Sequence, residues 1–168
     1  MEQLERGEIV VIKTDQDFGD AEHYQVYGLI DADVERIFKA IDDFDDYPKF
    51  MPRFEKVDET NDANIYIFNI ILPLNIKYKY KIKTKKWVEK PNLWLAWETI
   101  EWEENSIEET WGQWYLEPYN NQTLIHYQIY TDPGYIPFGF GWIVDVLTKN
   151  SLPEIVKNLK EWTENNEN

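Results

Sequence analysis

The sequence predicts an α+β domain in which a curved antiparallel sheet wraps around a long C-terminal helix. The clearest observation is the stretch from Asn75 to Trp87, where apolar residues alternate with five lysines. A period of two is that of a strand with one buried and one solvated face, which is typical of antiparallel sheets. The second observation is a series of strand-like segments separated by short turns. The third is an apolar stripe at helical spacing from about Phe138 to Glu164.

Two strands and a helix open the chain. Ile9 to Lys13 is short and β-branched, and Glu22 to Ile30 follows after a polar break, so both segments are predicted to be strands. Apolar residues then recur at helical spacing and predict a helix from Asp33 to about Asp43. Either Asp31 or Asp33 can cap this helix, because a carboxylate accepts hydrogen bonds from the unpaired N–H groups of the first turn.

Six strands form the middle of the chain. Their connections are short and rich in Asn, Asp and Pro, which predicts hairpins and an antiparallel meander. In the second of the six, Ile65 to Leu72, both the odd-numbered and the even-numbered positions are mostly apolar. Either face of this strand can therefore point inward. The predicted strands are Phe54 to Glu59, Ile65 to Leu72, Asn75 to Trp87, Leu93 to Trp102, Thr110 to Glu117 and Thr123 to Thr131.

The last predicted element is the helix that closes the concave face of the sheet. It begins near Phe138, after the break at Pro133 to Pro137. Pro153 lies inside this span and removes one backbone hydrogen bond. The helix therefore either kinks there or restarts, with Ser151 as the cap of the second part and the proline in its first turn.

Composition limits the classes of function. A chain of 168 residues fits one domain, residues 1–168, with a substantial core. The formal charge of -15 disfavours nucleic acid as a direct partner and anionic membrane surfaces. The chain has no cysteine, which excludes disulfides, thiol catalysis and thiolate metal sites. We see neither a secretory signal nor a run of about 18 apolar residues, and expect a cytoplasmic protein without a transmembrane segment.

The order of the elements resembles the helix-grip fold of the START-like (SRPBCC) superfamily, in particular its polyketide cyclase/dehydrase and coenzyme Q-binding branch. The resemblance covers almost the whole chain, with Asp33 and Val34 standing where that branch often has proline at the helix start. It implies binding of a hydrophobic molecule, such as a lipid, an isoprenoid quinone or a polyketide, between sheet and helix. A related bacterial branch acts on ribosomes, so the resemblance also leaves a protein partner as an alternative. The resemblance rests on Gly28 to Ile41, Tyr47 to Pro52, Gly112 to Leu116, and Pro133 to Pro137 leading into Leu152 and Pro153.

Aromatic residues on the inward parity of the strands are the candidate ligand contacts. Buried tyrosine hydroxyls usually need hydrogen-bond partners, so such a face can border a binding cavity. Gly112 on the same parity leaves room where a side chain would otherwise fill the core. The alternative is that these residues form ordinary core. The candidates are Tyr78, Tyr80, Trp97, Trp114, Tyr127, Ile129 and Trp142.

Two proline-bearing loops are placed to cover the opening of such a cavity. Phe50 and Met51 belong to the first loop, and Tyr135 and Ile136 to the second. A simple surface turn would not need these apolar residues, so we interpret the loops as gates. The alternative is that they cap one end of the core.

Catalytic and metal-binding signals are weak. Glu101 is the one candidate acid or base, on the condition that it points inward with Thr99. A cyclase or dehydratase needs a polar residue inside the pocket, and only Glu101, Thr99 or Asn69 is available. We interpret His126 as a surface residue, because it lies on the parity opposite Tyr127. The acidic run from Asp42 to Asp46 lacks the glycine and glutamate of a calcium loop. No nucleotide or phosphate motif is present, so we expect no metal and no cofactor.

Three classes of function remain open: a carrier of a hydrophobic ligand, a cyclase or dehydratase, and a protein-interaction module. The lysine row from Lys77 to Lys85 does not discriminate between them. We expect it to face solvent, with Glu98 as a cross-strand partner, and to serve solubility and protection of a sheet edge.

Overall fold

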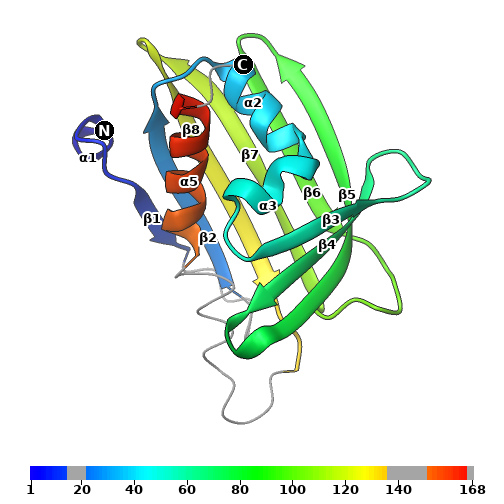
Figure 1. Cartoon of the computed structure of the whole chain (residues 1–168). Helices are drawn as coiled ribbons and strands as arrows, with labels where there is room; N and C mark the ends of the chain where they lie inside the picture. The colour runs from blue at the N-terminus through cyan, green and yellow to red at the C-terminus, as the bar shows by residue number, and fades with distance from the viewer. Residues whose placement is uncertain (15–21, 136–150, 166–168) are drawn as a thin grey trace.

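One antiparallel sheet of eight strands curves around helices on its concave side (Figure 1). The structure is a computed structural model, and it describes residues 1–14, 22–135 and 151–165. The strand order is β1-β2-β8-β7-β6-β5-β4-β3. This arrangement confirms the predicted fold class, a curved antiparallel sheet with a C-terminal helix.

Six consecutive strands, β3 to β8, form the predicted meander. The N-terminal hairpin of β1 and β2 joins the sheet through β2, which pairs with β8, the last strand of the chain. All pairs are antiparallel, and the predicted bounds are confirmed to within a few residues. The strands are β1 (Val10–Lys13), β2 (Glu22–Ile30), β3 (Phe54–Glu59), β4 (Ile65–Leu72), β5 (Ile76–Glu89), β6 (Asn92–Thr99), β7 (Glu109–Tyr119) and β8 (Gln122–Asp132).

Short helices lie before the first strand and between some of the strands. The cap of α2 is Asp33, whose Oδ1 accepts a hydrogen bond from the Arg36 N–H at 2.7 Å. The other candidate, Asp31, instead donates its backbone N–H to Glu164 of the C-terminal helix. The elements are α1 (Glu2–Glu5), α2 (Val34–Asp42), the 3-10 turn η1 (Phe44–Asp46), α3 (Tyr47–Phe50) and the 3-10 turn η2 (Pro73–Asn75).

The C-terminal helix, α5, runs from Leu152 to Asn165. Its first turn contains Pro153, a position at which the missing N–H removes no intrahelical bond. The Ser151 carbonyl accepts the N–H of Ile155 at 2.9 Å and so begins the hydrogen-bond ladder. This start agrees with the restart alternative. The earlier part of the predicted helix, from about Phe138, lies outside the described residues.

The inward face of β4 is now defined. Phe68 and Leu72 are buried on the concave side, while the isoleucines of the other parity are half-buried on the convex side. There Ile67 stands opposite Lys81 and Ile71 opposite Lys77. Lysine stems cover apolar surface while their ammonium groups stay in water, so this face can be apolar without being in the core.

The lysine row lies on the convex face, as predicted. Glu98 is the register partner of Lys83, while Lys77 pairs with Glu55 at 3.3 Å and Lys79 with Glu104 at 2.9 Å. The expectation of edge protection was wrong, because β5 lies between β4 and β6 in the interior of the sheet.

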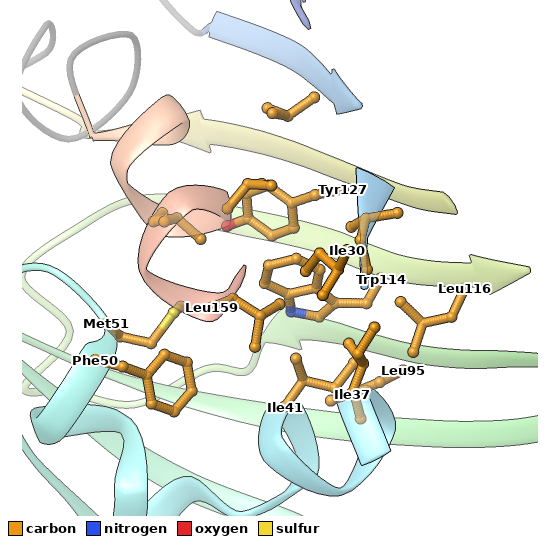
Figure 2. Packing of buried hydrophobic residues seen from close by; sticks show 14 of the residues in the cluster. Ile30, Ile37, Ile41, Phe50, Met51, Leu95, Trp114, Leu116, Tyr127 and Leu159 are labelled. Carbon is orange, nitrogen blue, oxygen red and sulfur yellow. The ribbon is translucent and has the colours of Figure 1, made fainter. Parts of the chain in front are cut away.

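The core lies between the concave face and the helices. α2 packs against β6 and β7, and α5 packs against β2 (Figure 1). Figure 2 shows Ile37 and Ile41 of α2 pointing toward Leu95 of the sheet; all three side chains are at most 1% exposed. α5 approaches β2 closely at Gly28, where an added Cβ would lie 2.9 Å from Cγ1 of Val156. The two helices therefore cover separate parts of the sheet.

Candidate functional site

A cavity lies on the concave side of the sheet, bounded by strands β4 to β8, the loop after α3 and the start of α5. Its volume is about 80 Å³. Most of its wall is aromatic or aliphatic, with a few polar groups. The described lining residues are Phe44, Tyr47, Met51, Pro52, Arg53, Phe54, Phe68, Ile70, Tyr80, Ile82, Thr84, Leu95, Trp97, Thr110, Trp114, Tyr127, Ile129, Ser151 and Ile155.

Five of the seven predicted ligand contacts line this cavity: Tyr80, Trp97, Trp114, Tyr127 and Ile129. Tyr78 does not; it is half-buried in a smaller apolar cluster with Ile70 and Leu72. Trp142 lies outside the described residues. The aromatic residues are packed against one another, with Trp114 and Tyr127 rings 4.1 Å apart at their centroids.

The three tyrosines of the cavity wall differ in the hydrogen bonds that their hydroxyls make. Tyr47 donates to the carbonyl of Ile41 at 2.7 Å. The hydroxyls of Tyr80 and Tyr127 make no hydrogen bond to any residue that the structure describes. Burial raises the pKa of Tyr80 and of Tyr127 well above 10, and the proximity of Tyr80 raises the pKa of Tyr127 further. Both phenols are therefore neutral donors that face the cavity.

Gly112 does not enlarge the cavity, contrary to the sequence-based interpretation. Trp97 is its cross-strand partner, and an added Cβ at Gly112 would lie 2.4 Å from Cζ2 of the Trp97 indole. The tryptophan thus fills the space that the glycine leaves.

The polar groups of the wall were largely missed by the sequence analysis. Thr84 and Thr110 donate their hydroxyls to backbone carbonyls, Thr84 to Asn64 at 3.4 Å and Thr110 to Tyr130 at 2.8 Å. The alternation in β5 could have predicted Thr84, since it continues the inward parity. Arg53 gave no periodic signal, because it lies in the loop between α3 and β3.

The candidate catalytic residues do not line the cavity. Glu101 is exposed and lies beyond the end of β6, so the condition that it points inward is not met. Thr99 accepts the N–H of Thr110 at 3.1 Å, and Asn69 donates to Asp58 at 3.0 Å on the convex side. None of the three therefore supplies an acid or base to the cavity.

Both histidines lie away from the cavity wall. His126 is on the convex face, as its parity predicted, but the expectation of a surface residue was wrong: it is half-buried and its Nε2 is enclosed without a hydrogen-bond partner. Its ring stacks on Tyr27 at 4.5 Å. Burial lowers the pKa of His126 below 6.5, an effect that Glu117 partly offsets. His23 is buried, with Nδ1 2.8 Å from the Thr14 hydroxyl.

The first predicted gate loop adjoins the cavity. Met51 lines it, and Phe50 is buried with its ring stacked 5.5 Å from that of Trp162 in α5. Asn158 of α5 donates to the Phe50 carbonyl at 2.8 Å. In the second loop, Tyr135 is 89% exposed. Ile136 lies outside the described residues.

The part of the chain that the structure describes offers neither a metal-binding cluster nor a membrane-spanning helix. Residues 1–14, 22–135 and 151–165 contain no group of three or more His, Asp or Glu side chains arranged to hold a metal ion. Among the helices of these ranges, none is both long and apolar enough to cross a membrane.

Solved structures share this architecture, although no protein-family model and no curated protein matches the chain. A STAR-related lipid transfer protein from Xanthomonas axonopodis is 16% identical with a TM-score of 0.74, and the match covers 93% of each chain. Human StAR-related lipid transfer protein 5 is 13% identical with a TM-score of 0.70, covering 94% of this chain and 82% of that one. The Zhui aromatase/cyclase from Streptomyces sp. R1128 is 10% identical with a TM-score of 0.66, covering 86% and 94%. The chain therefore has the START-like, helix-grip fold.

Proposed function

We propose that the protein binds a hydrophobic small molecule, of the lipid, isoprenoid quinone or polyketide type, between the concave sheet face and α5. The observation that carries this proposal is the pair of cavity-lining phenols, the buried Tyr127 and the half-buried Tyr80, whose hydroxyls make no hydrogen bond to a described residue. Buried tyrosine hydroxyls usually have a partner. A ligand with an apolar body and a carbonyl or hydroxyl oxygen would supply the acceptor, while the aromatic wall would cover its apolar part.

Ligand entry requires movement of the wall. The cavity of about 80 Å³ is smaller than the roughly 300–1,000 Å³ of typical small-molecule pockets. We place the gate at Phe50 and Met51, because this loop borders the cavity and contacts α5 through the hydrogen bond from Asn158 and the stacking of Phe50 on Trp162. We extend the proposed gate to Tyr135 and Ile136 of the second loop. The side chain of Tyr135 is 89% exposed.

A carrier is favoured over a cyclase or dehydratase. General acid–base catalysis needs a titratable group within hydrogen-bond reach of the substrate. The described lining contains no carboxylate or imidazole, and its threonines donate to backbone carbonyls. The phenols of Tyr80 and Tyr127 hold their protons more tightly than free tyrosine, because burial raises the pKa of each. A protein-interaction module would need no such polar atoms facing an internal cavity.

The proposal is tested with N-phenyl-1-naphthylamine, an uncharged probe that fluoresces in apolar sites. We expect saturable binding of one probe per chain, and about a tenfold or greater loss in Ile129→Trp, which fills the cavity. Ile12→Trp on β1 adds the same side chain at an exposed position and should bind the probe as the wild type does. Native mass spectrometry of protein purified from its own host would identify a bound molecule. Probe binding that Ile129→Trp leaves unchanged would contradict the proposal.

A further inference from the structure

The cavity wall contains one charged side chain among its described residues, that of Arg53. Its Nε atom is enclosed and has no hydrogen-bond partner. No ion pair links the guanidinium to an acidic side chain within residues 1–14, 22–135 and 151–165. The neighbouring acidic residue, Glu55, pairs instead with Lys77.

Lys39, Lys81, Lys83, Lys85 and Lys90 form no ion pair within the described ranges either, but Arg53 differs from them because one of its N–H donors is enclosed. An arginine is protonated at every accessible pH, so an enclosed, unpaired N–H of its guanidinium is unfavourable in the folded protein. At least nine other cations of the described ranges have acidic partners. They include Arg6, Lys13, Lys49, Lys56, Lys77, Lys79, Lys86, Lys157 and Lys160.

The backbone holds Arg53 in place at some conformational cost. Its φ of 69° lies in the left-handed region, which is uncommon for residues other than glycine. The Arg53 carbonyl accepts the N–H of Ile71 at 2.9 Å, and a β-bulge follows between Phe54 and Lys56. Strained residues and bulges of this kind cluster at ligand sites, where they direct a side chain.

We propose that Arg53 binds the anionic headgroup, a carboxylate or a phosphate, of an amphiphile whose apolar part occupies the cavity. This inference rests on the proposed function and narrows its ligand to an anionic class. The planar guanidinium donates in pairs to carboxylate and phosphate oxygens, which satisfies the enclosed Nε–H together with a second N–H. The overall charge of the protein repels anions, so a preference for them must arise locally.

Three ligands with the same ten-carbon tail test the proposal: decanoate, decyl phosphate and 1-decanol, each titrated by displacement of N-phenyl-1-naphthylamine. In the wild type we expect at least one anion to bind about tenfold or more tightly than the alcohol. Arg53→Gln should remove that preference and leave the alcohol within about twofold, and Arg53→Lys should retain part of it. Which anion binds more tightly distinguishes a fatty-acid headgroup from a phosphate headgroup.

Arg6→Gln is the matched control, because Arg6 is exposed in its pair with Glu8 and removing it changes the net charge equally. Anion binding that falls as much in Arg6→Gln as in Arg53→Gln would overturn the role of Arg53. The role of Arg53 would also be overturned if the wild-type protein bound 1-decanol as tightly as both anions. This comparison needs no variant, so it tests the proposal even if Arg53→Gln does not fold. Failure of the wild type to bind the probe at all would instead overturn the proposed function.

Discussion

The indole of Trp97 lies directly over Gly112, its partner across β6 and β7. A Cβ on Gly112 would come within 2.4 Å of the indole and 2.3 Å of the Gln128 carbonyl oxygen. The glycine therefore lets a large aromatic residue pack closely on the sheet and form part of the cavity wall. Trp97 in turn stacks on Tyr127, with ring centroids 5.7 Å apart.

Gly112→Ala should destabilise the protein by about 1–3 kcal/mol, because the added methyl group meets both a ring and a backbone atom. Urea denaturation measures the free energy of unfolding. Gln113→Ala, one residue along on the half-buried convex side, should have a smaller effect. Equal losses from the two variants would contradict the close packing of Trp97 on Gly112.

The three tyrosines of the cavity wall should respond differently to removal of their hydroxyls. Tyr127→Phe should leave the free energy of unfolding within about 0.5 kcal/mol of the wild type or raise it, because the hydroxyl makes no hydrogen bond to a described residue. Tyr47→Phe should lower it by about 0.5–1.5 kcal/mol, because the bond to the Ile41 carbonyl is lost. Urea denaturation of both variants makes the comparison. A Tyr127→Phe loss as large as that of Tyr47→Phe would show that the Tyr127 hydroxyl has a protein partner.

Local periodicity was sufficient to predict most of the fold. The alternation in β5 and the turn residues between the strands defined the meander, and the helical spacing defined α2. What periodicity could not supply was the pairing of β2 with β8, since these strands are distant in sequence. It also could not orient β4, because lysine stems allow isoleucine on the outer face as well.

The cavity was only partly predictable, for a different reason. Parity placed Tyr80, Trp97, Trp114 and Tyr127 on one face, and the structure brings them together around one space. Loop residues have no parity, so nothing in the sequence singled out Arg53. Parity alone also does not say how far a cavity extends, which is why Tyr78, on the same face of β5 as Tyr80, lies outside it.

Two variants test which aspartate, Asp31 or Asp33, caps the N-terminus of α2. Asp33→Ala should lower the free energy of unfolding by about 0.5–2 kcal/mol, since its carboxylate accepts the Arg36 N–H. Asp31→Ala should have a smaller effect, because the contact of Asp31 with Glu164 is made by the backbone. Thermal or urea denaturation of the two variants under the same conditions provides the comparison. The reverse order would mean that Asp31 is the cap.

His126 should make the stability depend on pH. Burial lowers its pKa in the folded protein below the 6.5 of the unfolded chain. The unfolded chain then takes up the proton first, so the contribution is complete above about pH 6.5 and is lost as pH falls toward the folded pKa. His126→Phe retains an aromatic ring against Tyr27 and should reduce the loss of stability between about pH 7.5 and about pH 5, by less than about 1 kcal/mol. Identical pH profiles for variant and wild type would exclude this role.

The contact between the first gate loop and α5 should control ligand exchange. Asn158 donates to the Phe50 carbonyl at 2.8 Å, and Phe50 stacks on Trp162 one helical turn further along α5. Asn158→Ala removes the hydrogen bond but keeps the ring contact, so it should cost about 0.5–1.5 kcal/mol, or a few degrees of melting temperature. Because the loop borders the cavity at Met51, the same change should increase the dissociation rate of N-phenyl-1-naphthylamine severalfold in stopped-flow measurements.

Asn165→Ala is the matched control, since the exposed Asn165 donates to the carbonyl of Glu161 within α5 itself. It should leave the dissociation rate of the probe unchanged. A gate and a core cap differ in how rate and stability move together. A gate opens while the sheet stays folded, so Asn158→Ala would increase the dissociation rate severalfold while the melting temperature falls by only a few degrees. If the melting temperature falls sharply and the dissociation rate does not change, Phe50 and Met51 close the end of the core, and the ligand must enter elsewhere.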